Sequence, residues 1–190
     1  MMQLQRRTKA GFTLIEVLVV VSIIGILSSM GVVGLKGAVA NSRVKDAAMN
    51  TAAFLERVGN LSKQQSVVIC LAIAPGTPRK LLALKSKGTD CSGDNKLAGG
   101  ALDSMMLEDP MKFVENKSGT CNFVGAVDMV GENAAFKPRI GLSSVPEGVV
   151  CVQHADDMRF GIARKQATLN SVKPFWKLGN DDGASGWFEL

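Results

Sequence analysis

The sequence has little of what catalytic and metal sites are usually built from. Its 190 residues include one histidine and no tyrosine. His154 has no second histidine or free cysteine as a partner, so it is weak as a metal ligand or a general base. Asp181, Asp182 and Gly183 resemble part of a calcium loop, but the acidic ladder is missing and a solvated turn is the better interpretation. With no phosphate-binding glycine loop and no nucleophile elbow, we interpret the chain as a non-enzyme without cofactor or metal.

Cysteine is also scarce, and its spacing excludes two kinds of small domain. Four cysteines in 190 residues are too few for a disulfide-stapled miniprotein. None of them forms a CxxC pair, which disfavours a zinc ribbon or a thioredoxin-like site. Apolar residues make up 46% of the chain and charged residues 21%. This composition provides enough apolar surface for a core, so disorder is excluded as the main state.

The net charge of +5 is concentrated at the N-terminus. Arg6, Arg7 and Lys9 lie in the first ten positions, with no acidic residue among them. The whole chain has 22 basic and 17 acidic residues. Without these three, 19 basic residues remain against 17 acidic ones, a net charge of +2. A protein that coats DNA through bulk charge is therefore not expected, and the basicity is mainly an N-terminal tag.

An apolar stretch follows this basic segment. Residues 12–35 carry one charge, Glu16. As a helix they would be about 36 Å long, enough for a hydrocarbon core of about 30 Å. The basic flank favours a cytoplasmic N-terminus, with the C-terminal part across the membrane. A cleavable secretory signal is the alternative, but its apolar core is typically about 7–15 residues long.

Glu16 is the anomaly in this stretch, because a carboxylate inside a bilayer is costly and by default a functional candidate. One alternative is that Glu16 lies at the headgroup boundary. If the chain instead began at Phe12, a new α-amino group four residues before Glu16 would provide a cationic partner, within the chain or from a neighbouring subunit.

The run from Gly11 to Glu16, GFTLIE, resembles the leader junction of type IV prepilins and type II secretion pseudopilins. The resemblance implies removal of residues 1–11 by a membrane prepilin peptidase, which cuts between Gly11 and Phe12 and methylates Phe12. It assigns Glu16 to filament assembly. It also implies an inner-membrane, single-pass protein with a periplasmic head, which later joins other pilins or pseudopilins in a filament.

Beyond the apolar stretch, we expect residues 36–65 to continue the helix with an amphipathic periplasmic section, since no proline occurs before Pro75. Residues 66–190 are expected to form a β-rich head. The expected strands are 67–73, 79–84, 112–114, 122–130, 135–142, 148–154, 160–164 and 187–190, with a loop over 85–104. The predicted fold class is α+β, type IV pilin-like: a long N-terminal helix, transmembrane in its first half, packed on a mainly antiparallel sheet.

Within the head, residues 50–165 loosely resemble the GspH/FimT family of minor pilins and pseudopilins. The resemblance is carried by the segment 52–73, by the FKPRIG run at 136–141 and by VVCV at 149–152. It implies a minor subunit of a type IV pilus, with a pseudopilin of a type II secretion system as the alternative.

If the head is periplasmic, its cysteines are in an oxidising compartment and disulfides are expected. We predict the pairs Cys70–Cys91 and Cys121–Cys151, which join neighbours in the sequence. Each loop would contribute roughly 3–4 kcal/mol in the chain-entropy model. A buried free thiol at Cys70 is the alternative.

Some FimT-like pilins are implicated in DNA binding during natural transformation, which makes DNA a second candidate partner. Between residues 158 and 180 there are five basic residues, no acidic residue, and two aromatic residues that would stack on bases. The candidates are Arg159, Arg164, Lys165, Lys173 and Lys177. The alternative, which we favour, is a solvated strand face with a core tryptophan. A second basic cluster has the same ambiguity: Arg79, Lys80, Lys85 and Lys87.

Overall fold

The computed structural model describes residues 11–93, 100–117, 120–131, 134–143, 147–155, 158–167, 171–179 and 186–190, without the side chains of 30–34 and of 143. The chain divides into two compact units, Met1–Val39 and Ala40–Leu190.

One helix, α1 (Leu14–Gln65), contains both helical sections expected from the sequence. Its interior has no proline, so every backbone N–H after the first turn can donate to a carbonyl four residues back. The helix ends at Gln65, and the next residue, Ser66, has a positive φ of 54°. Ser62 supports this end, since its hydroxyl donates to the Val67 carbonyl at 2.7 Å and its carbonyl accepts from the Val67 N–H.

The membrane span expected at 12–35 has no counterpart among the described residues, where no helix is both long enough and apolar enough to cross a membrane. Residues 30–34, inside the expected span, have side chains outside the described part. The transmembrane assignment therefore stays a prediction.

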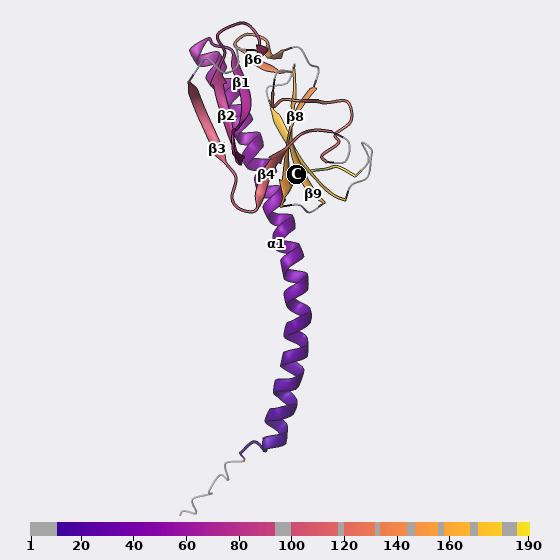
Figure 1. Cartoon of the computed structure of the whole chain (residues 1–190). Coiled ribbons are helices and arrows are strands. Elements are labelled where there is room, and N and C mark those ends of the chain that lie inside the picture. The colour runs from indigo at the N-terminus through magenta and orange to yellow at the C-terminus, as the bar shows by residue number, and fades with distance from the viewer. Residues whose placement is uncertain are drawn as a thin grey trace, which may run out of the picture. The chain divides into compact units, whose positions relative to one another are not determined.

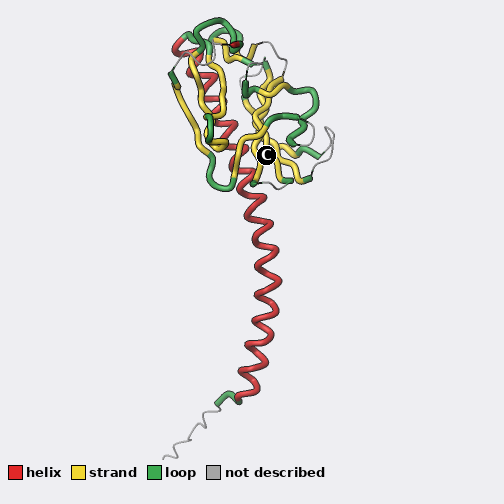
Figure 2. The backbone as a smooth tube through the Cα atoms, in the orientation of Figure 1, coloured by secondary structure: helices red, strands yellow, loops and turns green. Residues whose placement is uncertain are grey.

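The head contains two sheets with mostly antiparallel pairing, as the predicted α+β class requires (Figure 2). The first sheet has the order β3 (Ala101–Met106), β2 (Thr77–Lys85), β1 (Ile69–Ala74), β6 (Ala135–Lys137) and β7 (Gly141–Ser143). The second has the order β11 (Phe188–Glu189), β10 (Val172–Leu178), β9 (Arg159–Gln166), β8 (Glu147–His154) and β4 (Met111–Val114). A short strand, β5 (Val127–Asp128), pairs with β8 in parallel.

Several expected strands and loops differ from those observed. The expected loop 85–104 contains most of β3, which pairs with β2 at the edge of the sheet. An edge strand buries only part of one face, so the sequence of β3 lacks a strong apolar pattern. The expected strand 122–130 is reduced to β5 and a bridge at Val130, and 135–142 is divided by a turn. The sequence does not predict β10 as a strand, because Lys173, Pro174 and Lys177 interrupt the apolar pattern there, but the segment pairs with β9 along its whole length.

The second half of α1 lies between the two sheets and forms the core with both (Figure 1). Val44, Leu55 and Val58 are fully buried in one cluster with side chains of β1, β2, β8 and β9. These buried side chains of the helix recur every three or four residues and so form an apolar stripe along one face. Burial of this stripe stabilises the helix and the two sheets together.

Strand β9 lies directly on the helix. Arg159 Nε donates to Asn41 Oδ1 at 2.8 Å, and a Cβ at Gly161 would be 3.0 Å from Ala48 Cβ and from the Val44 carbonyl oxygen. Because side chains alternate along a strand, Ala163 and Lys165 share this helix-facing side. The opposite side of β9 carries Phe160 and Ile162 into a second cluster with the Cys121–Cys151 disulfide.

Candidate functional site

The residues at the predicted cleavage junction lie at the beginning of α1. Gly11 and Phe12 precede the helix, and the Phe12 side chain is 86% exposed. A Cβ at Gly11 would meet nothing within 4 Å. The peptide bond between these two residues is therefore not shielded by any described part of the chain.

Thr13 and Glu16 form a capping box at this end of the helix. The Glu16 carboxylate oxygen Oε2 accepts hydrogen bonds from the Thr13 backbone N–H at 3.0 Å and from the Thr13 hydroxyl at 2.9 Å. In return, the Glu16 N–H donates to Thr13 Oγ1 at 3.3 Å. Reciprocal bonds of this kind satisfy N–H groups that the first turn leaves without helical partners. The Thr-x-x-Glu spacing is a sequence signal for this cap, and the assignment of Glu16 to assembly does not use it.

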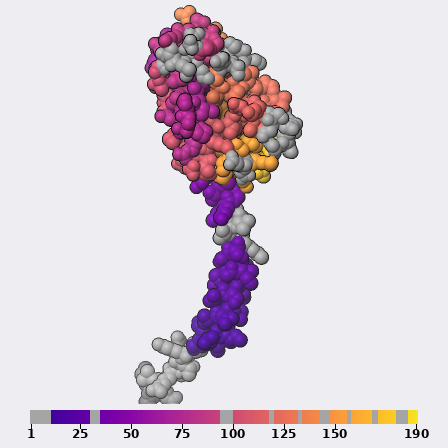
Figure 3. All heavy atoms as spheres, viewed as in Figure 1, coloured from indigo at the N-terminus to yellow at the C-terminus, as the bar shows by residue number. Residues whose placement is uncertain are grey.

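The first half of α1 after this cap exposes apolar side chains, and no other described residues cover them (Figure 3). Most large apolar residues between Phe12 and Leu27 are about half exposed or more. Such an area is far larger than scattered apolar residues on a soluble surface, and it indicates an interaction with lipid or protein.

Both predicted disulfides are present, and the structure has no free cysteine. Cys70–Cys91 joins β1 to the segment after β2, across 21 residues. Cys121–Cys151 joins a loop to β8, across 30 residues. The buried-thiol alternative for Cys70 is wrong, because its sulfur is bonded to that of Cys91.

The five basic residues named as DNA-binding candidates do not lie on one face. Arg159 bonds to Asn41 on the helix-facing side of β9, and Lys165 on the same side is 6% exposed. Arg164, on the opposite side, forms a two-point ion pair with Glu147. Its guanidinium also lies 5.6 Å from the centre of the Phe123 ring.

The two candidates on β10 differ from each other as well. Lys173 is exposed and pairs with Glu189 at 2.7 Å. Lys177 is 2% exposed, and its Nζ lies 5.8 Å from the Trp187 ring centre. Lys173 pairs with Arg164 in the register of β9 and β10, so these two and Lys177 lie on one side of the sheet. Burial and ion pairing, rather than strand alternation, distinguish them from one another. In the second cluster, Arg79 forms an ion pair with Asp109 at 2.9 Å.

His154 lies at the end of β8 in a cationic environment. Burial lowers the pKa of its imidazole first, and the neighbouring charges of Arg159 and Arg43 lower it further. Its Nδ1 is buried and has no hydrogen-bond partner among the described residues. Nor do three His, Cys, Asp or Glu side chains within that part of the chain gather where they would hold a metal ion. The suggested calcium loop at 181–183 lies outside the described residues.

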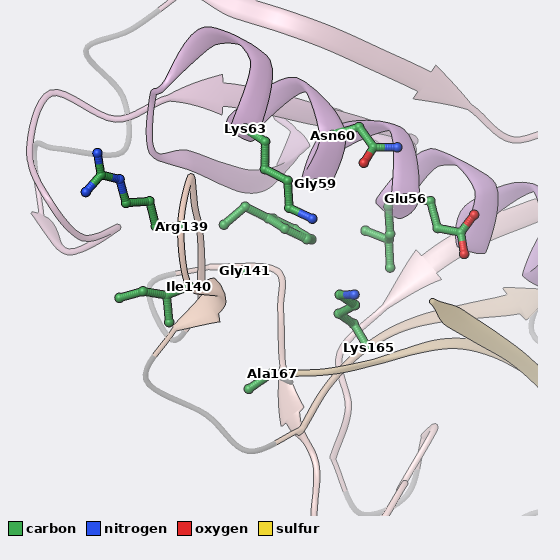
Figure 4. A pocket seen from close by; sticks show the side chains of 11 residues that line it. Glu56, Gly59, Asn60, Lys63, Arg139, Ile140, Gly141, Lys165 and Ala167 are labelled. Atoms are coloured by element: carbon green, nitrogen blue, oxygen red, sulfur yellow. The ribbon is translucent and has the colours of Figure 1, made fainter. Parts of the chain in front are cut away.

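A cavity of about 270 Å³ is the feature that the sequence did not predict (Figure 4). It lies between the last turns of α1, the turn that joins β6 to β7, and the end of β9. Its charged lining residues are Glu56, Lys63, Arg139 and Lys165. We call it the lysine cavity, because Lys63 and Lys165 point toward one another from opposite walls, whereas the Arg139 guanidinium points away. Positions 63, 139 and 165 are so far apart in sequence that no local pattern relates them.

Comparison with known families supports the N-terminal interpretation alone. Residues 6–32 match the family model described as the prokaryotic N-terminal methylation motif. This part of the chain is type IV prepilin-like, which implies processing by a prepilin peptidase, inner-membrane anchoring and assembly with other pilins. No curated protein and no solved structure matches the chain.

Proposed function

We propose that this protein is a minor type IV pilin subunit, a structural protein that takes part in assembling or priming a type IV pilus. The observation that carries the proposal is the methylation motif at residues 6–32, placed on an exposed junction before a capped apolar helix. In this role the chain is a substrate of the prepilin peptidase. It becomes active in assembly once residues 1–11 are removed and Phe12 is N-methylated.

The capping box suggests how Glu16 takes part. Cleavage before Phe12 would create a cationic amine next to Thr13, on the same end of α1 to which the Glu16 carboxylate turns back. Both Thr13 bonds are accepted by one oxygen, Oε2, and a carboxylate has about four acceptor positions. Glu16 can therefore keep the cap and still bind an amine, its own or that of a neighbouring subunit.

The exposed apolar side chains support two successive environments for the helix. In the inner membrane, lipid would cover residues 12–35, and in a filament the same side chains would pack against helices of other subunits. A buried carboxylate is costly in either environment unless it has a cationic partner. Because of this cost, subunits whose Glu16 pairs with an amine would leave the membrane for the filament more readily than subunits whose Glu16 is unpaired.

A pseudopilin of a type II secretion system is the alternative, because both machines use the same leader and helix. DNA binding stays a prediction from the sequence. Arg164, Lys173 and Lys177 share one side of the sheet, but the first two are paired with carboxylates and the third is buried. No described contact therefore favours DNA binding as a second function.

The test separates the charge of Glu16 from its cap. Glu16→Gln keeps an acceptor for the Thr13 N–H but removes the charge, and Glu16→Val removes both. We expect both variants to remain in the membrane fraction and to be lost from sheared filaments. Glu115→Gln is the matched control, since Glu115 is an exposed carboxylate of the head that pairs with Lys117. Normal filament content of Glu16→Val would contradict the proposal.

The choice of machine needs a second measurement. Deleting the gene should reduce piliation and leave type II secretion unchanged if the protein belongs to a pilus. Loss of secretion with normal piliation would favour the pseudopilin alternative.

A further inference from the structure

Exposed apolar side chains of the head lie where α1 enters it. Met158 and Leu178 are at the adjacent ends of β9 and β10, since the Gly179 N–H donates to the Met158 carbonyl at 2.7 Å and Leu178 pairs with Arg159. Both side chains are 55% exposed. Arg159 donates to Asn41 at 2.8 Å, in the first turn of the part of α1 that belongs to the head unit. These strand ends therefore lie beside the entry of the helix.

Met106 has a corresponding position on the other sheet. It is the last residue of β3, and its side chain is 57% exposed. Together with Arg43 of α1, it lines a cleft of about 180 Å³ between the helix and the connection from β3 to β4. This connection lies at the end of the head where α1 enters (Figure 1). Exposed apolar side chains from both sheets thus flank the helix, and we call Met106, Met158 and Leu178 the entry residues.

The position of the entry residues along the chain limits what can cover them. Inner-membrane anchoring through residues 12–35 is part of the proposed function, and this inference rests on it. The five steps from Leu35 to Ala40, the first residue of the head unit, span at most about 18 Å. The polar headgroups add roughly 5–8 Å to each side of the hydrocarbon core. The length of the chain alone therefore holds this end of the head close to the headgroups.

The charges at this end of the head provide little net attraction for an ionic partner. Arg43 shares its cleft with two carboxylates, Asp46 and Glu108. The remaining surface that needs a partner is apolar, and two of the three entry residues are methionines. Methionine is flexible and polarisable, so it adapts to irregular surroundings and needs no shape-matched partner. These properties favour a fluid surface over a second folded protein.

A tryptophan and a lysine adjoin the entry residues. Trp176 lies two residues before Leu178 on β10, and its half-buried ring is 4.4 Å from Lys45 Nζ of α1. Tryptophan is enriched at membrane–water interfaces, and lysine extends its ammonium group toward water while its stem lies on apolar surface. The pair therefore has the composition of a membrane interface, one turn of α1 from Asn41.

We propose that the entry residues contact the headgroup region of the inner membrane while the subunit is anchored there. Because the contact is apolar, it forms on zwitterionic as well as on anionic lipid, and it persists at high salt, where interactions between exposed charges are screened. Such a contact orients the head on the bilayer before the subunit joins a filament.

Quenching of Trp176 fluorescence by labelled lipid tests the proposal. The full chain has two tryptophans, and Trp187→Phe leaves Trp176 as the reporter and keeps an apolar ring against Phe123. This parent is placed in phosphatidylcholine vesicles with or without phosphatidylglycerol, and vesicle flotation first measures anchoring. A nitroxide on the lipid headgroup then reports contact of Trp176 with lipid, and acrylamide reports its contact with water. We expect quenching by the nitroxide in both kinds of vesicle, at low and at high salt.

Two variants show whether the entry residues make this contact. The double variant Met106→Glu with Leu178→Glu should lose the nitroxide quenching, and the fold should persist because both positions are exposed. Ile140→Glu is the matched control, which should be quenched as the parent is. Ile140 is 65% exposed and lines the lysine cavity with Asn60, about 30 Å along α1 from Asn41.

Every other outcome overturns the proposal. Anchored protein whose Trp176 is not quenched by the nitroxide would disprove the contact, and so would equal quenching in the parent and the double variant. Protection of Trp176 from acrylamide that rises with protein density, without nitroxide quenching, would assign the surface to a second copy of the chain. Failure of the parent to float with vesicles would contradict the anchoring in the proposed function, and the inference with it.

Discussion

The carboxylate of Glu16 accepts two hydrogen bonds from Thr13, one from the backbone N–H at 3.0 Å and one from the hydroxyl at 2.9 Å. This places the charge of Glu16 at the very beginning of α1, turned back toward Phe12. The resemblance assigns Glu16 to assembly by its position in the motif. The structure adds a second role, because Glu16 caps N–H groups at the first turn of the helix. The cap and the proposed assembly role are separable by mutation, because the cap needs an acceptor and the proposed role needs a charge.

Thr13→Ala should loosen the first turn of the helix. Replacing a threonine N-cap by alanine costs about 1 kcal/mol, so amide exchange at the first helical residues should become roughly fivefold faster. Thr13→Ser keeps the hydroxyl and serves as the control. Equal exchange rates in parent, Thr13→Ser and Thr13→Ala would show that the cap contributes nothing.

Gly11→Ala, or a bulkier replacement, should leave the chain unprocessed. The side chain would enter open space, so the fold should not change and the effect should arise at the peptidase. Intact mass spectrometry of membrane-extracted protein measures this directly, since the uncut chain retains residues 1–11. A normal mature mass would refute the cleavage assignment.

Replacing Cys121 and Cys151 together by serine should lower the free energy of unfolding by about 2–5 kcal/mol, because the 30-residue loop is no longer closed in the unfolded chain. Denaturant unfolding followed by tryptophan fluorescence provides the measurement. Reduction of the parent protein should reproduce the loss and add that of Cys70–Cys91. A double variant as stable as the parent would contradict this expectation.

The stability of the head should fall with acidification in a manner that depends on His154. Its pKa is lowered in the folded state by burial and by Arg159 and Arg43, so the unfolded chain binds the proton more readily. Stability is therefore lost as the pH falls below the unfolded value of about 6.5. His154→Gln should lose less free energy of unfolding between pH 7 and pH 5 than the parent. Parallel losses in the two proteins would count against this role of His154.

Gly161→Val should destabilise the contact between β9 and α1. A Cβ there would lie 3.0 Å from Ala48 Cβ and from the Val44 carbonyl oxygen, and overpacking of this kind costs about 1–3 kcal/mol. Gly59→Ala is the matched control. Its Cβ would meet only the Phe136 ring at 3.7 Å, and alanine stabilises a helix interior by up to about 1 kcal/mol over glycine. The expected signs are opposite, and a stabilising Gly161→Val would disprove the close approach.

The N-terminal motif and the helix α1 were predictable from the sequence, and each for a local reason. The GFTLIE run is contiguous, and the apolar periodicity that forms α1 is a property of neighbouring residues. The predicted pairing of the cysteines was one of three connectivities that the sequence left open, because Cys91 and Cys121 are as far apart along the chain as Cys121 and Cys151. The fold decided it in favour of Cys70–Cys91 and Cys121–Cys151. The sequence by itself determined the motif and the helix, because short-range spacing carries both.

Only the tertiary structure decided which charges meet. Arg164 and Lys165 are adjacent in the sequence, but β9 turns one toward Glu147 and the other toward the helix. Lys63 and Lys165 are about a hundred residues apart and line one cavity, because β9 packs along α1. The strand β10 was missed since its lysines break the apolar pattern, although the Lys177 side chain is buried over Trp187. Successive side chains of a strand point to opposite sides of the sheet. Whether a side is buried or exposed depends on the elements that pack against it, and these come from distant parts of the chain, so no local pattern encodes it.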